Sequence, residues 1–560
     1  MNLLLSVAIT LLLSCIGLTL NASQKVKVIA HGWDILAVQP HQLLENADQL
    51  NRMPIDGVIV NVSGQTDDGK KLSHKNIAYG SRWRFEYFSH LIPTLKEVVK
   101  QPSLRHSFAG AWIGNTWRND DSANRKRWDD DAAWDVFANN LGVLTRIVRE
   151  SGLEGIIIDN EDYSKIKQYF WQESDGDYEE VRKLARKRGR EVFGAAFREK
   201  ADLKIMAFWF LSWPFAYNYL TSDDPDAMRR KSGDLWPDFV NGMLDVMPDS
   251  ARFIDGCETT YGDRADRDDA FRKAKALLNN VLPLIEPENH VAYRGKMLFA
   301  PAQYLDSYTI TNKSSIYYMP PMEKGSRLDR FAENLCQTVS SSDGYIWLYG
   351  ERYSYIKWRG VKLKRCSEKT WDEMLPGFNA TVGSYRNAGA FGTRRFDEWN
   401  ESGAIPVNLF KNGSCEIKNI PKGGGLVTNR FTHGLFSWKG SGQGVIGTDT
   451  SCGRGDCFSV CLDKVKKGGI MVKIDDVKPG ERYVVRVFAR GLNPRGAAYF
   501  RNGYPSFPFE FGEVSDNGWR VGHSYVVVPS GMKILNVMFS GSENETLWYD
   551  DIGIYADGHN

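Results

Sequence analysis

The fold is decided by one stretch of the chain, Gly155-Ile156-Ile157-Ile158-Asp159-Asn160-Glu161-Asp162-Tyr163. Its apolar run predicts a strand that is buried on both faces, and its carboxylates follow at the carboxyl end, where a parallel barrel opens to solvent. Asp159 and Glu161 are two positions apart, so on a strand they share a face with Ile157. We therefore expect a paired acid site at a barrel mouth. The alternative is that these acids only cap the following helix.

The same design recurs along the first part of the chain. Apolar or β-branched runs end in polar or aromatic residues, and helical patterns lie between them; the runs are residues 26–30, 57–60, 108–112, 155–159, 204–211, 253–257, 297–300 and 345–349. One helix is clear, because Trp134, Phe137, Leu141 and Leu144 recur at helical spacing. This rhythm predicts a (β/α)8 TIM barrel. A doubly wound open sheet is the alternative, but no Gly-rich phosphate motif follows a strand.

The chain of 560 residues is long enough for one large domain and one smaller domain. Residues 1–22 carry a short apolar run typical of a secretory signal peptide, so we expect a secreted protein. The barrel is expected over residues 23–387, followed by a linker at 388–407 without clear periodicity. Residues 408–560 read as short strands broken by Gly, which predicts an all-β jelly-roll sandwich. No other stretch has the apolar length of a membrane span.

Composition narrows the classes of partner. A net charge of +2 and 25% charged residues describe a globular protein with no electrostatic reason to bind nucleic acid. The basic excess is too small to argue for sulfated or uronate-bearing substrates. Aromatic residues reach 12%, and their rigid faces suit stacking on sugar rings. The sequence leaves the oligomeric state open.

The cysteines fall into two groups. Those in the first domain are scattered and are expected to be buried thiols, whereas those in the second are clustered and allow disulfides; they are Cys257, Cys336 and Cys366, and then Cys415, Cys452, Cys457 and Cys461. Their spacing does not match a zinc site.

Acidic residues end several of the predicted strands: Asp159, Glu161, Glu258 and Glu351. Cleaving a glycosidic bond requires two carboxyl groups, one protonated to release the leaving oxygen and one ionised to attack or to activate water. A barrel mouth supplies such a pair from different strands, and this chemistry needs no cofactor.

Candidate substrate contacts lie at the same strand ends. They are polar or aromatic residues on or just beyond the predicted strands: His31, Trp33, Asp34, Asn61, Trp112, Asn115, Trp209, Trp213, Tyr261, Gln303, Trp347 and Tyr349. Trp347 is the preferred candidate, because it shares strand parity with Tyr349 and Glu351. For the tryptophans, packing in the core is an equally good explanation.

The ending Ile158-Asp159-Asn160-Glu161 resembles that of barrel glycosidases such as the α-glucosidase and α-galactosidase clans. The resemblance implies Asp159 as the nucleophile and Glu258 as the acid/base. The arrangement is also similar to the chitinase-like family, which would make Asp159 orient a substrate acetamide and Glu161 protonate the leaving group. Ile157 stands where that family has an earlier Asp.

The second domain resembles jelly-roll carbohydrate-binding modules in three motifs, at residues 408–416, 477–483 and 548–555. The resemblance implies that Glu416 and Asp551 share a structural Ca²⁺, for which carboxylate oxygens are suitable ligands. These residues can equally be strand caps. Cys415 replaces the usual aromatic residue, so a purely structural module is also open.

The sequence therefore predicts a secreted glycoside hydrolase that acts on a polysaccharide or glycan. The alternative from another class is a non-catalytic carbohydrate-binding protein on a barrel scaffold, because a fold alone does not confer activity. A polysaccharide lyase is less favoured, because no His/Tyr/Lys set for its base is evident.

Overall fold

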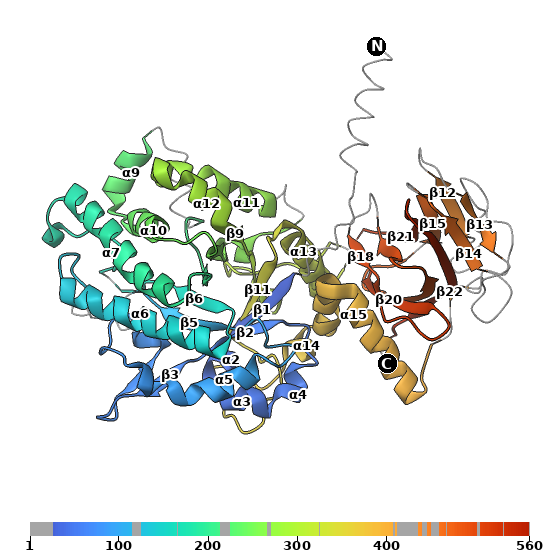
Figure 1. Cartoon of the computed structure of the whole chain (residues 1–560), viewed down its shortest axis with the longest axis horizontal. Coiled ribbons are helices and arrows are strands. Elements are labelled where there is room, and N and C mark those ends of the chain that lie inside the picture. The colour runs from blue at the N-terminus through green and yellow to red at the C-terminus, as the bar shows by residue number, and fades with distance from the viewer. Residues whose placement is uncertain are drawn as a thin grey trace, which may run out of the picture.

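The computed structural model describes residues 26–114, 125–164, 166–212, 224–265, 270–323, 325–406, 409–410, 435–439, 445–449, 459–465, 468–475, 477–500, 505–529 and 531–558. It shows a larger domain of helices around a parallel sheet and a smaller β domain (Figure 1). The long helix α15 (Phe378–Ser402) lies between them.

The sheet of the larger domain is parallel and curled. Its strands, in sheet order, are β10 (Ala302–Tyr304), β11 (Tyr345–Gly350), β1 (Lys27–Gly32), β2 (Gly57–Val60), β5 (Phe108–Trp112), β6 (Gly155–Asp159), β7 (Lys204–Ala207), β8 (Arg252–Asp255) and β9 (Met297–Phe299). The end strands β9 and β10 are separated in the chain only by Ala300 and Pro301. Every predicted strand of this domain is present, and the open, doubly wound order is not.

Side-chain alternation explains why these strands are apolar throughout. Ile157 of β6 packs inside the curl with inward residues of the neighbouring strands, such as Ile29 and Met206. Ile156 and Ile158 point the other way, into the core between sheet and helices. A strand with both faces buried needs apolar side chains at every position.

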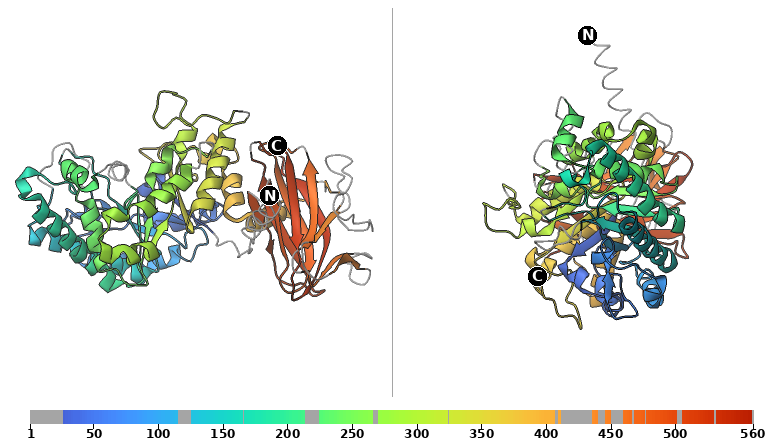
Figure 2. Two further views of the ribbon diagram at one scale, coloured as in Figure 1. Left: turned by 90° about the horizontal axis from the view of Figure 1, so that it is seen from above. Right: turned by 90° about the vertical axis from the view of Figure 1, so that its left-hand side faces the viewer.

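Helices cover the outer face of the sheet (Figure 2). They are α2 (Trp33–Ala37), α3 (Pro40–Glu45), α4 (Ala47–Leu50), α5 (Ile92–Val98), α6 (Asp131–Ser151), α7 (Tyr178–Glu199), α9 (Pro225–Ser232), α10 (Trp236–Asp245), α11 (Ala270–Asn280), α12 (His290–Lys296), α13 (Arg327–Ser341) and α14 (Trp371–Met374). The predicted helix is α6. The Asp130 side chain caps its first turn at 3.0 Å from Ala133 N, and Gly152 ends it with φ of 81°.

The β domain contains two antiparallel sheets around its own apolar core. One sheet has the order β12 (Leu435–Lys439), β15 (Gly468–Asp475), β21 (Ile534–Ser540), β17 (Arg495–Tyr499) and β18 (Ser506–Pro508). The other has the order β13 (Val445–Asp449), β14 (Ser459–Asp463), β22 (Thr546–Ala556), β16 (Arg482–Arg490), β20 (Trp519–Val527) and β19 (Glu510–Phe511). The prediction of a β domain after the parallel domain is confirmed.

Residues 388–402, which the sequence predicts as an aperiodic connector, are helical and belong to α15. The helix is kinked at Asn387, where φ is −160°. Beyond the kink, Phe396 and Trp399 pack against Tyr525 and Val527 of β20. Packing against another domain stabilises a helix whose own pattern is weak, which local sequence does not reveal.

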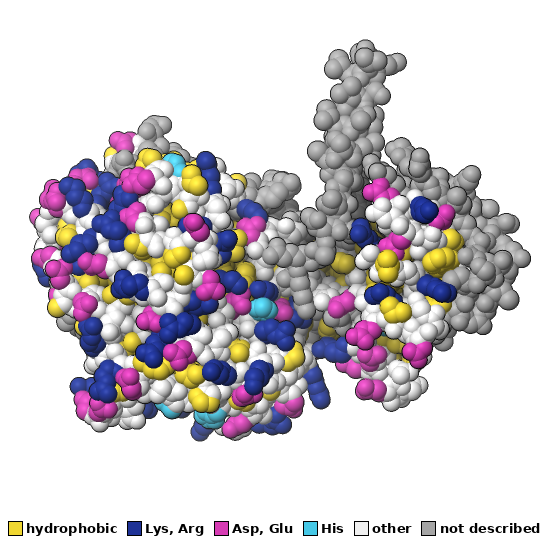
Figure 3. All heavy atoms as spheres, in the orientation of Figure 1, with side chains coloured by type: hydrophobic (Ala, Val, Ile, Leu, Met, Phe, Trp, Pro, Cys, Tyr) yellow, Lys and Arg dark blue, Asp and Glu magenta, His cyan; other side chains and the backbone are white. Residues whose placement is uncertain are grey.

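Basic and acidic side chains alternate over the face of the larger domain in Figure 3. Among the described residues, no helix combines the length and the apolar character that crossing a membrane requires.

Candidate active site

The predicted acids occupy the carboxyl ends of three strands. Asp159 is the last residue of β6 and Glu161 follows it, Glu258 begins a short 3-10 helix after β8, and Glu351 follows β11. Burial is the main reason that the pKa of Asp159 lies well above its usual value. The charges of Glu161 and, to a smaller extent, Glu258 raise it further. Burial and the charge of Glu161 also raise the pKa of Glu258, to about 8. These mutual effects show that the carboxyl groups share one site.

The acids after β6 belong to this site and do not cap a helix. The Glu161 N–H donates to Asp159 Oδ1 at 2.9 Å, and the Tyr163 hydroxyl donates to Glu161. The next long helix, α7, is capped by Asp177, whose side chain accepts from the first backbone N–H groups. The capping alternative is therefore wrong. Burial raises the pKa of Glu161, and the Tyr163 hydroxyl opposes that rise.

A strained turn places Glu258. Cys257, directly before it, is a non-glycine residue with φ of 41°, in the left-handed region. Asp255 at the end of β8 fixes this turn, because its carboxylate accepts from Cys257 N at 2.9 Å and from Ser212 Oγ at 2.5 Å. The same carboxylate accepts from Phe210 N at 3.0 Å and so ties the segment after β7 to the turn. Backbone strain of this kind concentrates at functional sites.

Two tyrosine hydroxyls orient Glu351. Tyr349 donates to Oε1 at 2.8 Å, and Tyr304 donates to Oε2 at 3.0 Å. The Glu351 N–H donates to Asp306 Oδ2 at 2.7 Å, which holds the backbone. Burial raises the pKa of Asp306 to about 6.

Stacked rings form the floor of the site. Tyr261 stacks on Tyr304 with centroids 5.0 Å apart and on Tyr349 at 6.0 Å. Trp347 lies below them, stacked on Phe208 at 5.0 Å, with its Nε1 donating to Gly256 O at 2.8 Å. Its side chain is fully buried, so it supports the tyrosines from beneath. Of these rings, Tyr261 and Tyr349 are half-buried and Trp347 is not exposed.

His31 is the next-to-last residue of β1, and Asn61 follows β2. His31 stacks on Tyr349 at 4.9 Å, and burial lowers its pKa to about 3, so it is neutral. Asn61 Oδ1 lies 2.8 Å from His74 Nδ1. Trp112 packs on His74 with ring centroids 4.6 Å apart.

Two of the predicted substrate contacts have structural hydrogen bonds. Asp34 is fully buried and accepts from Tyr355 N at 2.8 Å and from Trp358 Nε1 at 2.9 Å, so it anchors the loop after β11. Burial raises its pKa to about 6. Gln303 donates to Thr338 Oγ1 of α13 at 2.8 Å, so its side chain points to the helix layer. Its neighbour Tyr304 faces the site instead, because it shares the parity of Ala300 and Ala302, which lie inside the curl.

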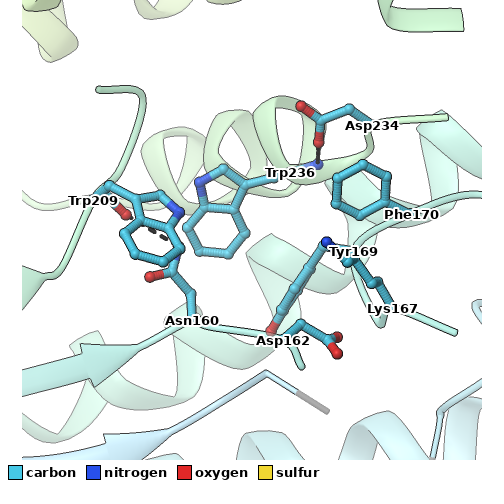
Figure 4. A pocket seen from close by; sticks show the side chains of 8 residues that line it. All are labelled: Asn160, Asp162, Lys167, Tyr169, Phe170, Trp209, Asp234 and Trp236. Atoms are coloured by element: carbon cyan, nitrogen blue, oxygen red, sulfur yellow. Dashed lines mark hydrogen bonds between the residues drawn. The ribbon is translucent and has the colours of Figure 1, made fainter. Parts of the chain in front are cut away.

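Trp209 lines a pocket whose walls include none of the four predicted acids (Figure 4). The volume of this pocket, counting the part open to solvent, is about 410 Å³. Aromatic and polar residues line it: Asn160, Asp162, Lys167, Tyr169, Phe170, Trp209, Asp234 and Trp236. The Asn160 side chain donates to Trp209 O at 3.1 Å. Asn160 alternates with Asp159 and Glu161, so it points to the outer side of β6.

Several residues of the site were not predicted. They are three tyrosines that each interact with at least one of the acids: Tyr163, Tyr304 and Tyr317. The ring of Tyr317 meets that of Tyr304 edge-on, with centroids 5.2 Å apart. Burial raises the pKa of Tyr317 most, and the charges of Glu258, Glu161 and Glu351 raise it further. Tyr163 and Tyr317 lie in loops, where no periodicity places a side chain.

Some predicted residues lie outside the described part of the chain: Asn115, Trp213, Glu416, Cys415, Cys452 and Cys457. Asp551 is described and lies in β22 at a register shift opposite β16, with φ of 46°. Within the described ranges, no three His, Cys, Asp or Glu side chains are grouped closely enough to hold a metal ion. The calcium site and the disulfides therefore stay predictions.

No family model matches the chain, and no curated protein matches it. Similar solved structures include a bacteriophage CBA120 tailspike domain, with 16% identity, 27% of this chain, 21% of that chain and a TM-score of 0.21. A Clostridium thermocellum endo-1,4-β-D-xylanase with a carbohydrate-binding module has 11% identity over 22% of this chain and 26% of that chain, with a TM-score of 0.19. A family 4 carbohydrate-binding module has 15% identity over 26% of this chain and 99% of that chain, with a TM-score of 0.20. The chain thus spans about a quarter or less of the first two proteins. At these TM-scores the likenesses carry no argument about this chain.

Proposed function

We propose that this protein is a glycoside hydrolase that cleaves glycosidic bonds in a polysaccharide or glycan. The observation that carries the proposal is Glu258, a carboxylic acid whose pKa burial and the Glu161 charge raise to about 8. At neutral pH it keeps its proton and can donate it to a leaving oxygen. Its electrostatic partner Glu161 comes from a different strand, as a pair flanking a bond requires.

The roles within the pair follow from the surroundings. Glu161 accepts the Tyr163 hydroxyl, which favours its charged form, and it is more open to solvent than Asp159. We assign Glu258 as the general acid and Glu161 as the base or nucleophile. Asp159, buried and bonded to the Glu161 backbone, is a positioning residue. The tyrosine floor offers ring faces to a sugar.

We infer further that the curled sheet is a (β/α)8 barrel in which β9 and β10 form one interrupted strand. Phe299 O accepts from Asp343 N at 2.8 Å, and Pro301 O accepts from Trp347 N at 3.4 Å. These bonds support pairing of the interrupted strand with β11 along both of its halves. Pro has no N–H to donate, which accounts for a break at this position.

The remaining proposals concern export and the β domain. Residues 1–22 would act as a signal peptide for secretion, and the β domain would be a jelly-roll module that holds substrate or braces the barrel. Helix α15 already covers the outer face of β20, so the other sheet is the one left to meet a glycan. A Ca²⁺ bound by Glu416 and Asp551 would be structural.

The test is hydrolysis of a glycan panel by the purified chain, with product anomers identified by NMR. Glu258→Gln and Asp159→Asn should each lower hydrolysis by roughly a hundredfold or more, because the first removes the proton donor and the second disturbs the carboxylate that positions Glu161. Glu323→Gln, which changes an exposed carboxylate, is the matched control. Full activity of the Glu258→Gln variant would remove the proposed acid from the mechanism. Binding of glycans without any hydrolysis would favour the non-catalytic carbohydrate-binding alternative.

A further inference from the structure

Two exposed cations from other segments lie over tryptophan rings at the ends of β1 and β5, strands that only β2 separates in the sheet. Lys75 Nζ lies 5.1 Å from the centroid of the Trp112 ring, and Arg365 Cζ lies 4.4 Å from that of Trp33. Both cationic residues are exposed. Each is held by a tryptophan face, which attracts a cation without neutralising it.

These cations lie close to one another. Burial lowers the pKa of Lys75, and the charge of Arg365 lowers it further. Among the residues that the structure describes, neither side chain has a carboxylate within ion-pair distance. Most surface cations of this chain do have such partners; Arg359, for example, pairs with Asp48. Two like charges without a counter-ion form a local positive potential that attracts an anion.

A row of neutral side chains joins the two cations to the acids. His74 Nδ1 donates to Asn61 Oδ1, which makes the buried His74 Nε2 an acceptor, and this atom has no hydrogen-bond partner among the described residues. His74 acts on the pKa of His31, which stacks on Tyr349. Tyr349 in turn donates to Glu351. This row of contacts runs from Glu351 along the ends of β11, β1, β2 and β5, which are consecutive in the sheet, toward the two cations.

We propose that Lys75 and Arg365, held on Trp112 and Trp33, form a subsite for an anionic substituent of the saccharide, a carboxylate or a sulfate ester. The inference rests on the proposed function and names its substrate class. The planar guanidinium suits either oxyanion, and Lys75 adds a point charge.

The experiment measures binding by calorimetry, using the full chain with Glu258→Gln to prevent turnover. The probes are neutral, uronate-containing and sulfated oligosaccharides of equal length. At least one charged probe should bind about tenfold more tightly than the neutral one at low salt, and added salt should reduce the difference. The uronate and sulfate probes separate the two sources of the charge.

Lys75→Ala and Arg365→Ala in the same background should each weaken the charged probe severalfold and leave the neutral probe unchanged. Lys364→Ala, at the neighbouring position in the same loop, is the control and should change neither. Unfolding curves of all the variants show whether the contacts of Lys75 with Trp112 and of Arg365 with Trp33 serve only to stabilise the fold. Equal binding of charged and neutral probes, or unchanged binding by both variants, would overturn the proposal.

The outcome is separable from that of the hydrolase proposal. If the Glu258→Gln chain prefers charged probes while the parent chain releases no sugar from any glycan, the anion subsite stands and hydrolysis is wrong. If the parent chain cleaves neutral and charged glycans equally well and shows no preference in binding, hydrolysis stands and the subsite is wrong.

Discussion

Burial raises the pKa of three acids at this site, Asp159, Glu161 and Glu258. Glu258 lies against Glu161, and both burial and that charge favour its neutral form, so its pKa is about 8. Glu351 is held in place by the hydroxyls of Tyr304 and Tyr349. Environments that separate the proton affinities of neighbouring carboxyl groups are what acid/base catalysis requires.

The raised pKa of Glu258 predicts a pH dependence of stability. The folded chain binds this proton up to about pH 8, whereas an unfolded chain releases it near the usual 4.5. The free energy of unfolding should therefore fall as pH rises from about 4.5 to about 8. Glu258→Gln should remove this fall and be more stable than the parent at pH 9 by roughly 2–4 kcal/mol. Urea denaturation at pH 5 and 9 measures it; parallel changes in the two proteins would contradict the assignment.

The same proton sets the pH profile of the proposed activity. Because the acid form of Glu258 donates the proton, kcat/KM should decline as pH rises through about 8. Initial rates between pH 5 and 10 on a cleaved glycan provide the measurement. A profile that is flat through pH 8 to 10 would exclude Glu258 as the essential acid.

The two ends of the parallel sheet perform different tasks. At the carboxyl end, strands present acids and rings. At the amino end, Glu154 bonds Lys27 at 3.2 Å, His106 at 2.8 Å, Lys204 and Tyr345, and so ties β1, β7 and β11 together. Burial by itself would raise the pKa of Glu154, but the hydrogen bonds from His106, Lys204 and Tyr345 outweigh it and lower the pKa. In barrels, the amino end contributes stability and the carboxyl end chemistry.

Glu154→Gln should therefore destabilise the fold by roughly 3 kcal/mol, because it leaves several partners without their charge, while the activity of the folded protein is unchanged. Chemical denaturation and rates measured well below the unfolding midpoint test both parts. Glu150→Gln is the control, since its pair with Arg146 is on the surface and should contribute less than about 1 kcal/mol. A loss of activity at unchanged stability would contradict the division between the two ends.

The turn after β5 supports the strand that carries the acids. A Cβ added at Gly114 would lie 1.9 Å from Glu161 O, so a side chain must displace that backbone. Gly114→Ala should lower kcat by roughly a hundredfold, as a shift of about 1 Å in a catalytic group does. Gly262→Ala is the control, because no heavy atom lies within 4 Å of its added Cβ. Equal rates for both variants would show that Glu161 tolerates displacement.

On the scale of the whole molecule, α15 couples the two domains. Arg386 forms an ion pair with Asp56 of the parallel domain, with one nitrogen at 2.6 Å, and Phe396 and Trp399 pack on the β domain. Because buried contacts on both sides of the kink tie α15 to both domains, the domains should unfold together.

Phe396→Ala should separate the two unfolding transitions, because it removes a buried ring that contributes about 3–5 kcal/mol to this contact. Differential scanning calorimetry is expected to show one transition for the parent and two for the variant. Asp397→Ala changes an exposed residue of the same helix and should keep one transition. One transition in Phe396→Ala, shifted only in Tm, would mean that the coupling lies elsewhere.

Alternation along strands was enough to predict the parallel sheet and the acids at its carboxyl end. Gln303 is not at the site because the same alternation runs through Pro301: Ala300 and Ala302 lie inside the curl, so Tyr304 shares their face and Gln303 points to α13. Alternation could not reveal α15, whose apolar residues are buried by another domain. Tyr317 was missed because the position of a loop depends on contacts distant in sequence.

The sequence by itself determined where strands form and which of their residues share a face, because both depend on a local period of two. Only the tertiary structure decided that the pKa of Glu258 is raised and that Lys75 and Arg365 influence each other with no carboxylate paired to either among the described residues. Both properties depend on burial and on charges brought together from distant segments. The overall charge of +2 therefore did not reveal a local positive site.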